Sequence, residues 1–312
     1  MLIGVFKSNQ KIINGLVVLL AIVLWLPAFF SDPDLTGLFS TSIKWLDILL
    51  LISLISGQAI YLNFVVAEYR LVKGNSHLTS LFFILLNSCF LSFHEMNEIV
   101  IANTLVITAF HQFLRIYNSK NNYSIAFNAG FLIGLAGLIY FPALIYFVLL
   151  WLVLIYTTTP VWRDFIISLI GVSVPIIYLV VYQFVFGNLA LLNLSDYLFQ
   201  TFVIEWKNFT LYNQIFLSLL LVVLLFSFLS LFTAIGKSVV KTSKMLVAVF
   251  LMFVLGLGTL FLNQYDFLAT FLVVSIPSAI IIANFFQNIE RVWLAEILFS
   301  CLLISMVAGY FS

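Results

Sequence analysis

Residues 124–157 read SIAFNAGFLIGLAGLIYFPALIYFVLLWLVLIYT, an unbroken stretch without a charged side chain. As one helix this stretch would rise roughly 51 Å, whereas the hydrocarbon core of a bilayer is about 30 Å thick. Phe141-Pro142 lies near its middle, and proline breaks a helix because it lacks an N–H and its ring clashes with the preceding turn. The sequence therefore predicts two short spanning helices, 124–139 and 141–157.

The rest of the chain is nearly as apolar as this stretch. Hydrophobic residues make up 64% of the 312 residues and charged residues 8%, whereas a soluble domain carries about 25% charged residues. No water-soluble core could bury this much apolar surface, so lipid must be the second solvent, and only helices fit a pattern without alternation. We expect an all-α, polytopic transmembrane helical bundle that forms one integral membrane domain over residues 1–312. The net charge of +1 excludes a nucleic-acid partner.

Eleven apolar stretches are separated by short polar gaps. They cover approximately residues 12–30, 46–66, 78–93, 98–116, 124–139, 141–157, 164–186, 211–235, 245–262, 267–287 and 293–311. With the N-terminus inside, the inner gaps hold eleven Lys or Arg residues and the outer gaps hold two, Lys44 and Lys207. Positive charge marks the cytoplasmic side. The pattern predicts a multi-pass protein of the cell inner membrane with a cytoplasmic N-terminus, an uncleaved first span and a periplasmic C-terminus.

Two acidic segments face the outer side in this topology. Asp32 and Asp34 follow the first span, and residues 94–98 (HEMNE) fill the second outer gap. On a helix His94 and Glu98 would share a face, a spacing that suits a divalent cation, and a carboxylate can act as a general base. Candidate catalytic residues are therefore Asp32, Asp34, Glu95 and Glu98, and candidate metal ligands are His94, Glu95 and Glu98. The alternatives are a plain turn at residues 32–34 and a solvated hairpin tip at residues 94–98.

Clustered acids are costly unless they share a cation or a proton, so we expect the first and second outer loops to approach each other, with Asp32 or Asp34 within about 10 Å of His94 or Glu95. The long outer gap 187–210 mixes aromatic and charged side chains, which predicts an amphipathic helix on the outer surface; an anchored connector is the alternative. Small residues recur at helical spacing in residues 129–137 and indicate close helix packing. Cys89 and Cys301 lie inside apolar segments, so no disulfide is expected.

Two segments carry a resemblance. Residues 127–142 (FNAGFLIGLAGLIYFP) and 162–175 (WRDFIISLIGVSVP) together resemble an uncharacterised family of multi-spanning membrane proteins from Bacteroidetes, a domain of unknown function. More distantly, the layout is similar to that of the GT-C membrane glycosyltransferases. Those enzymes have an inside N-terminus, an acidic motif in the first outer loop, in some cases a further acid in the second, and a Gly-rich pair of short helices in mid-chain. Asp32 or Asp34 would match the first acid, and Glu95 or Glu98 the second.

This similarity implies a GT-C-like arrangement and an enzyme that transfers a sugar from a polyprenyl-phosphate donor to an acceptor at the outer, periplasmic face. Asp32 or Asp34 would be the base, and Glu95 or Glu98 would assist or hold a divalent metal ion. Its partners would be membrane lipid and the polyprenyl-phosphate sugar. Two other functions fit the sequence: a non-catalytic assembly or scaffold protein of the envelope, and a lipid or small-molecule transporter.

Overall fold

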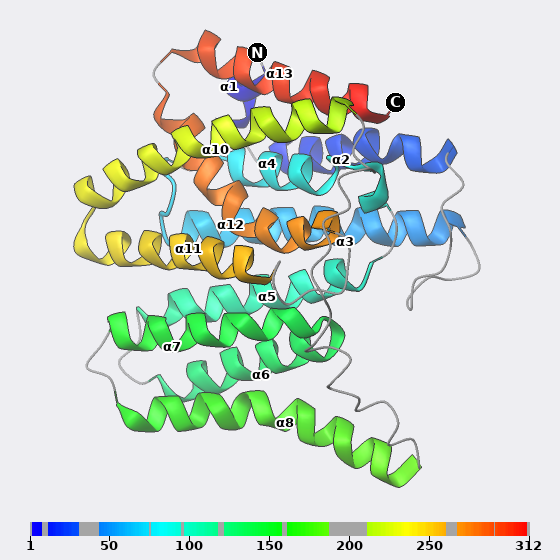
Figure 1. Ribbon diagram of the computed structural model, residues 1–312. Coiled ribbons are helices and arrows are strands. Elements are labelled where there is room, and N and C mark those ends of the chain that lie inside the picture. Colours follow the sequence, from blue (N-terminus) through cyan, green and yellow to red (C-terminus); the bar gives the residue numbers. More distant parts are fainter. Residues whose placement is uncertain are drawn as a thin grey trace. The chain divides into compact units, whose positions relative to one another are not determined.

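The computed structural model describes residues 2–7, 12–30, 44–74, 76–94, 97–117, 122–157, 161–186, 211–259, 267–289 and 291–310 (Figure 1). These residues form helices and connecting turns, without strands: α1 (Leu2–Phe6), α2 (Ile12–Phe30), α3 (Lys44–Glu68), α4 (Leu78–Asn87), η1 (Leu91–His94), α5 (Glu98–Ile116), α6 (Tyr123–Ile139), η2 (Phe141–Ile145), α7 (Tyr146–Thr157), α8 (Trp162–Phe186), α10 (Leu211–Lys237), α11 (Val240–Gly258), α12 (Phe267–Asn288) and α13 (Val292–Tyr310). The predicted all-α class is confirmed for the described part of the chain. The GT-C-like arrangement stays a prediction.

Most predicted spans coincide with a helix to within a few residues. The predicted span 78–93 is the exception, because α4 ends at Asn87 and the separate 3₁₀ turn η1 follows. Among the described residues, seven helices are long and apolar enough to cross a membrane, in α3, α5, α8, α10, α11, α12 and α13, and four further apolar helices are shorter. These helices indicate a membrane-embedded protein. The number of crossings, the inner-membrane location and the side that each terminus faces stay predictions.

The stretch 124–157 is divided as its proline predicts. Helix α6 ends at Ile139, Tyr140 takes an extended conformation (φ −136°, ψ 99°), and the 3₁₀ turn η2 begins at Phe141 with Pro142 in its first turn. The first turn of a helix tolerates proline, because the N–H groups there have no partner within the helix and the missing one is not needed. The break at Tyr140 therefore separates α6 from α7.

Contacts group the chain into two compact units, which are described separately. Unit 1 comprises Met1–Val100, Glu205–Leu246 and Ser275–Ser312, and unit 2 comprises Ile101–Ile204 and Val247–Val274. The expectation of a single membrane domain stays a prediction.

Helices α6 and α8 of unit 2 pack with their backbones nearly touching. A Cβ on Gly134 would lie 2.7 Å from the Val172 carbonyl oxygen, and a Cβ on Gly171 would lie 2.5 Å from the Phe127 carbonyl oxygen. Gly130 meets the Ser168 carbonyl oxygen in the same way. Side chains of any size would push the two helices apart, so the predicted packing through small residues is confirmed.

Helix α4 forms the interior of unit 1, where all ten of its residues are buried. Amide side chains connect neighbouring helices: the Asn87 Nδ2 donates to Ser275 Oγ of α12 (3.1 Å), and the Gln58 Nε2 donates to the Val100 carbonyl oxygen of α5 (2.7 Å). Buried polar groups need such partners because burial removes their water. The amides of this interior therefore serve as bridges between helices.

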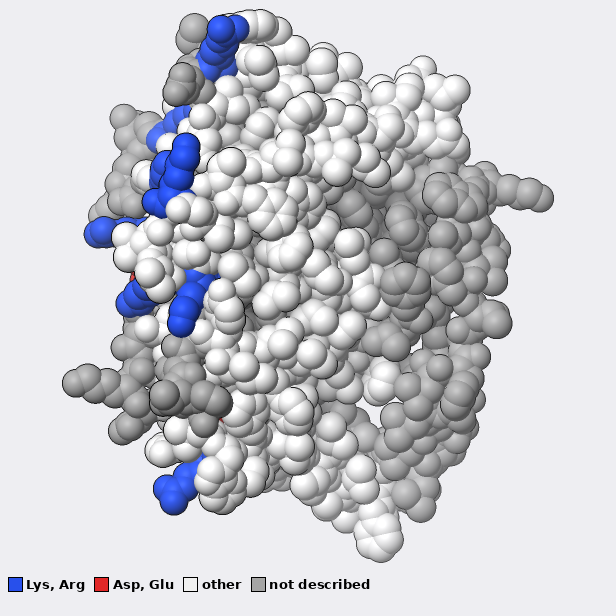
Figure 2. All heavy atoms as spheres, turned by 60° about the vertical axis from the view of Figure 1, so that its left-hand side comes forward, with Lys and Arg blue, Asp and Glu red and all other residues white. Residues whose placement is uncertain are grey.

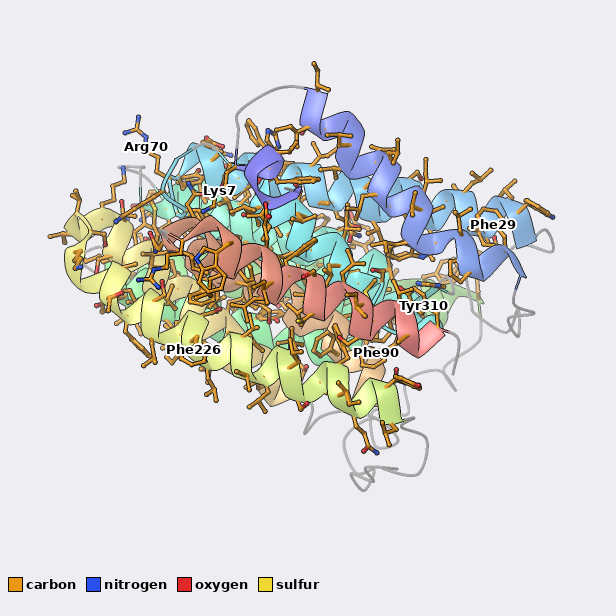
Figure 3. The ribbon with its side chains drawn as sticks, turned by 90° about the horizontal axis from the view of Figure 1, so that it is seen from above. Lys7, Phe29, Arg70, Phe90, Phe226 and Tyr310 are labelled. Carbon is orange, nitrogen blue, oxygen red and sulfur yellow. The ribbon has the colours of Figure 1, made fainter. Side chains whose placement is uncertain are left out.

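The two ends of unit 1 differ in chemistry. At one end Lys7 Nζ donates to the Ile289 carbonyl oxygen, just before α13 begins; at the other end Tyr310, the last residue of α13, donates its hydroxyl to the Ser88 carbonyl oxygen. Figure 3 shows Lys7 and Arg70 on one side of the unit and Phe29, Phe90 and Tyr310 on the other. We call these the cationic end (Lys7, Arg70, Lys73, Lys237, Lys241, Lys244 and Arg291) and the aromatic end (Trp25, Ser88, Phe90, His94, Phe216 and Tyr310).

Candidate functional site

Of the predicted site residues, His94 lies at the aromatic end and Glu98 begins the helix that follows it. His94 is the last residue of η1, and Glu98, half-buried, is the first residue of α5. Asp32, Asp34 and Glu95 lie outside the described residues, so their proximity to one another stays a prediction. The described chain stops at Phe30 before the first acidic loop and at His94 inside the second.

Three aromatic side chains from distant parts of the sequence meet here. The His94 ring lies between Trp25 of α2, at a centroid distance of 4.9 Å and an interplanar angle of 39°, and Tyr310 of α13, at 5.3 Å and 62°. Aromatic pairs favour such tilted and edge-on arrangements at 4.5–7 Å. The contact brings the helix that leads into the first acidic loop against the segment that carries the second.

Tyr310 is held from the side of α4. Its hydroxyl donates to the Ser88 carbonyl oxygen, and the Ser88 hydroxyl lies 3.7 Å from the Met306 sulfur, one turn earlier in α13. Ser88 follows α4, whose hydrogen-bond ladder ends there. The last turn of α13 is therefore fixed to the end of α4, and it presents the tyrosine ring edge-on to the imidazole.

Phenylalanines extend this cluster. The Phe90 ring packs edge-on against Phe93 at 5.2 Å and against Phe216 of α10 at 6.0 Å. Asn213, one turn before Phe216, places its Oδ1 atom 2.8 Å from where a Cβ on Gly309 would stand. Helices α2, α10 and α13 thus converge with η1 around one aromatic cluster.

His94 has an unusual environment for an imidazole. Its side chain is 3% exposed, and neither ring nitrogen has a hydrogen-bond partner among the described residues. The Nε1 atom of the fully buried Trp25 is without a partner there as well. Buried polar atoms are nearly always hydrogen-bonded, so unpartnered ones mark a place where a ligand, an ion or water would be stabilised.

Burial keeps this imidazole neutral. Desolvation lowers the pKa of His94 from 6.5 to about 4, and the nearby backbone carbonyl of Ser88, which favours the protonated ring, offsets this only in part. A neutral imidazole has one lone pair that can accept a proton or ligate a metal, and one N–H that can donate. His94 can therefore serve as a hydrogen-bond partner or a metal ligand, but as a neutral ring it adds no positive charge near pH 7.

A divalent ion would need more donors than the described residues supply. In the part of the chain that the structure describes, no three His, Cys, Asp or Glu side chains are grouped closely enough to hold a metal ion. The unpartnered nitrogens of His94 fit a ligand role, and the remaining donors would come from Glu95 and the first acidic loop. The metal site at His94, Glu95 and Glu98 stays a prediction.

The sequence analysis did not identify Trp25 and Tyr310 as part of the candidate site. Each lies near the end of an apolar stretch, where Trp and Tyr usually anchor a helix at the membrane interface. Neither has a polar neighbour in sequence that would mark it as part of a site.

No disulfide was expected between Cys89 and Cys301, and both are free thiols.

Comparison with known proteins gives the family but no activity. Residues 1–312 match the model of a family of unknown function, DUF6427, and the chain belongs to this family. No curated protein matches the chain, and no solved structure does.

Proposed function

We propose that this member of a family of unknown function is an integral inner-membrane enzyme that transfers a sugar from a polyprenyl-phosphate donor at the periplasmic face. The proposal places its site at the aromatic end of unit 1. The observation that carries it is the ring contact between Trp25 and His94, since Trp25 lies in the last turns of α2, before Asp32 and Asp34. Two loops that both carry acids therefore leave the unit from adjoining segments.

The chemistry assigns a role to each group. An acceptor hydroxyl would attack the anomeric carbon of the donor sugar, the carbon–oxygen bond to the phosphate would break, and Asp32 or Asp34 would take the hydroxyl proton. Polyprenyl phosphate would be the leaving group. A divalent ion held by His94, Glu95 or Glu98 would neutralise the charge that develops on that phosphate.

The unpartnered groups of the aromatic end support a polar ligand. His94 and Trp25 together supply an N–H donor each and one acceptor nitrogen, all surrounded by aromatic rings. Binding sites of this kind are mostly apolar, with few polar groups that fix the orientation of the ligand. A sugar that enters between lipid and protein would find hydrogen-bond partners that the protein itself leaves unused.

One observation favours a second function. Trp25 and His94 are 0% and 3% exposed, so their rings fill the interior of this end rather than lining an open surface. A non-catalytic assembly or scaffold protein of the envelope would show the same close packing. The enzyme and the scaffold differ in whether Asp32 and Asp34 are needed for chemistry or only for solvation of a loop.

Release of polyprenyl phosphate tests the enzyme directly. Purified full-length protein in lipid nanodiscs is incubated with a panel of polyprenyl-phosphate hexoses, a membrane extract as acceptor source, and Mg²⁺ or Mn²⁺. We expect release by the native protein and a loss of at least about 100-fold in the Asp32→Asn/Asp34→Asn variant, since general-base catalysis contributes about 10²–10⁴-fold. Glu68→Gln, an exposed change at the cationic end, is the control and keeps full release. Equal release by all three proteins would refute the role of these acids, and no release by any of them would favour the scaffold.

A further inference from the structure

The cationic end of unit 1 carries more Lys and Arg side chains than described acidic ones. Seven Lys and Arg residues lie on α10, α11 and the segments that follow α1, α3 and α12. The described acids closest to them in the sequence are Glu68, which is exposed, and Glu296, which is half-buried. In the upper part of Figure 2, at the height of α1, α10 and α13 in Figure 1, Lys and Arg side chains lie along one edge with little red among the blue.

Three of these cations surround the end of α12. Lys7 reaches it by the hydrogen bond from Nζ to the Ile289 carbonyl oxygen (3.3 Å). Arg291 follows two residues later and is exposed. Lys73 precedes Gly74, whose backbone lies beside α12, since a Cβ on Gly74 would lie 3.2 Å from Gln287 Nε2. Lys7, Lys73 and Arg291 therefore form a triad around the last turn of one helix.

The backbone near Lys73 is sharply turned. Arg70 and Gly74 both have positive φ angles, 52° and 75°, a conformation that costs energy for a residue with a side chain and persists where the surrounding structure enforces it. Nearby, the His77 N–H donates to the Phe6 carbonyl oxygen at 2.8 Å, which ties this loop to α1. The loop thus holds Lys73 on the same side of the unit as Lys7.

Interaction with the C-terminal carbonyl groups of α12 accounts for only one of the three positive charges. The last carbonyl groups of a helix carry partial negative charge and attract a cation. Lys7 already fills this role, and partial burial lowers its pKa without removing its hydrogen bond. Among the described residues neither Lys73 nor Arg291 has an ion-pair partner. Both residues are exposed.

We propose that the triad of Lys7, Lys73 and Arg291 binds the phosphate group of an anionic phospholipid of the surrounding membrane. Basic side chains at the membrane surface attract acidic lipids, and basic pockets between spanning helices hold their headgroups. Arg291 can donate two parallel hydrogen bonds to one phosphate, whereas Lys7 and Lys73 act as point charges. The apolar helices beside the triad would contact the acyl chains, which free phosphate lacks. This binding is independent of the proposed sugar transfer.

The test uses the purified full-length protein in a neutral detergent. Its apparent Tm is measured while phosphatidylglycerol, phosphatidylcholine or inorganic phosphate is added, because a ligand that binds only the folded state stabilises it by RT ln(1 + [L]/Kd). We expect the Tm to rise with the logarithm of the phosphatidylglycerol concentration above Kd and to change little with the other two. The Lys7→Gln/Lys73→Gln/Arg291→Gln variant should bind phosphatidylglycerol about ten-fold more weakly or worse.

Matched variants separate a specific site from general attraction. Lys7→Arg/Lys73→Arg keeps every charge and the two parallel donors of Arg291, and it should bind within roughly three-fold of the native protein. Lys237→Gln/Lys241→Gln removes two exposed charges outside the triad and should have a smaller effect than the triad change. If the triple glutamine variant loses its fold, the single changes Lys73→Gln and Arg291→Gln, both at exposed positions, should each weaken binding. An equal response to phosphatidylcholine, an equal response to phosphate, or unchanged affinity in the glutamine variants would overturn the proposal.

Discussion

His94 shows how burial of a single residue gives the protein a measurable pH dependence. Its folded-state pKa is about 4, below its ordinary value of 6.5. Between these values the unfolded chain binds a proton that the folded chain does not, so stability is complete above pH 6.5 and is lost as the pH falls toward 4. We expect the apparent Tm in detergent to drop over this range, and to drop less steeply in the His94→Phe variant.

The slope of Tm against pH is the informative quantity, because His94→Phe can also change the Tm at neutral pH by altering the contacts with Trp25 and Tyr310. The control is Phe93→Leu, which changes a ring of the same cluster without removing a titratable group and should keep the native slope between pH 6.5 and 4. Identical slopes for the native protein and His94→Phe would mean that His94 is accessible to protons in the folded state.

At the scale of elements, the α6–α8 pair gives the sharpest prediction for stability. Gly134→Ala would place a methyl group 2.7 Å from the Val172 carbonyl oxygen, where backbone cannot yield without separating the helices. Overpacking of this kind costs about 1–3 kcal/mol, more than the roughly 1 kcal/mol that alanine gains over glycine in a helix. We expect a lower apparent Tm and a lower yield of folded protein.

Gly57→Ala is the matched control for this change. It makes the same substitution inside α3, where nothing lies within 4 Å of the new Cβ. Its apparent Tm should equal or exceed the native value, since only the helix preference of alanine acts there. If Gly134→Ala were as stable as Gly57→Ala, the close backbone approach of α6 and α8 would be wrong.

The segment 187–210, which lies outside the described residues, carries a separate prediction. Its mixture of aromatic and charged side chains predicts that it lies along the outer surface. In a variant that lacks the native thiols, cysteines placed at Asp196 and at Asn208 should both react with an impermeant thiol reagent added from outside. A cysteine at Lys241 should stay protected, and protection of both outer positions would exclude the surface helix.

Helices were the predictable part of this structure, and contacts between distant segments were not. Apolar length and Phe141-Pro142 locate the helices because lipid leaves no other way to pair backbone groups. Glycine spacing predicts the α6–α8 contact because close approach requires the absence of a side chain. The contact of Trp25 and Tyr310 with His94 depends on which helices from the two ends of the chain are neighbours. The hydrophobic pattern of the sequence does not show this. The acidic residues of the candidate site remain predicted from the sequence alone.

At the scale of the whole molecule, the direction of insertion follows from unit 1. Lys7 lies at its cationic end and Tyr310 at its aromatic end, so the two ends of the chain lie at opposite ends of the unit. Positive charge keeps a loop on the cytoplasmic side during insertion. We therefore expect a cytoplasmic N-terminus, a cytoplasmic α10–α11 turn with Lys237 and Lys241, and a periplasmic C-terminus.

Paired reporter fusions measure this orientation. Green fluorescent protein fused after Lys241 should fluoresce, and alkaline phosphatase at the same position should be inactive, because each reporter works on one side of the membrane only. Fusions after Ser312 should give the reverse pattern. A fluorescent, phosphatase-inactive fusion after Ser312 would place Tyr310 and His94 on the cytoplasmic side, and Lys7, at the opposite end of unit 1, would then face the periplasm. The sugar transfer proposed at the aromatic end could then not take place at the periplasmic face. Lipid binding by Lys7, Lys73 and Arg291 would concern the periplasmic leaflet, and the same variants would still test it.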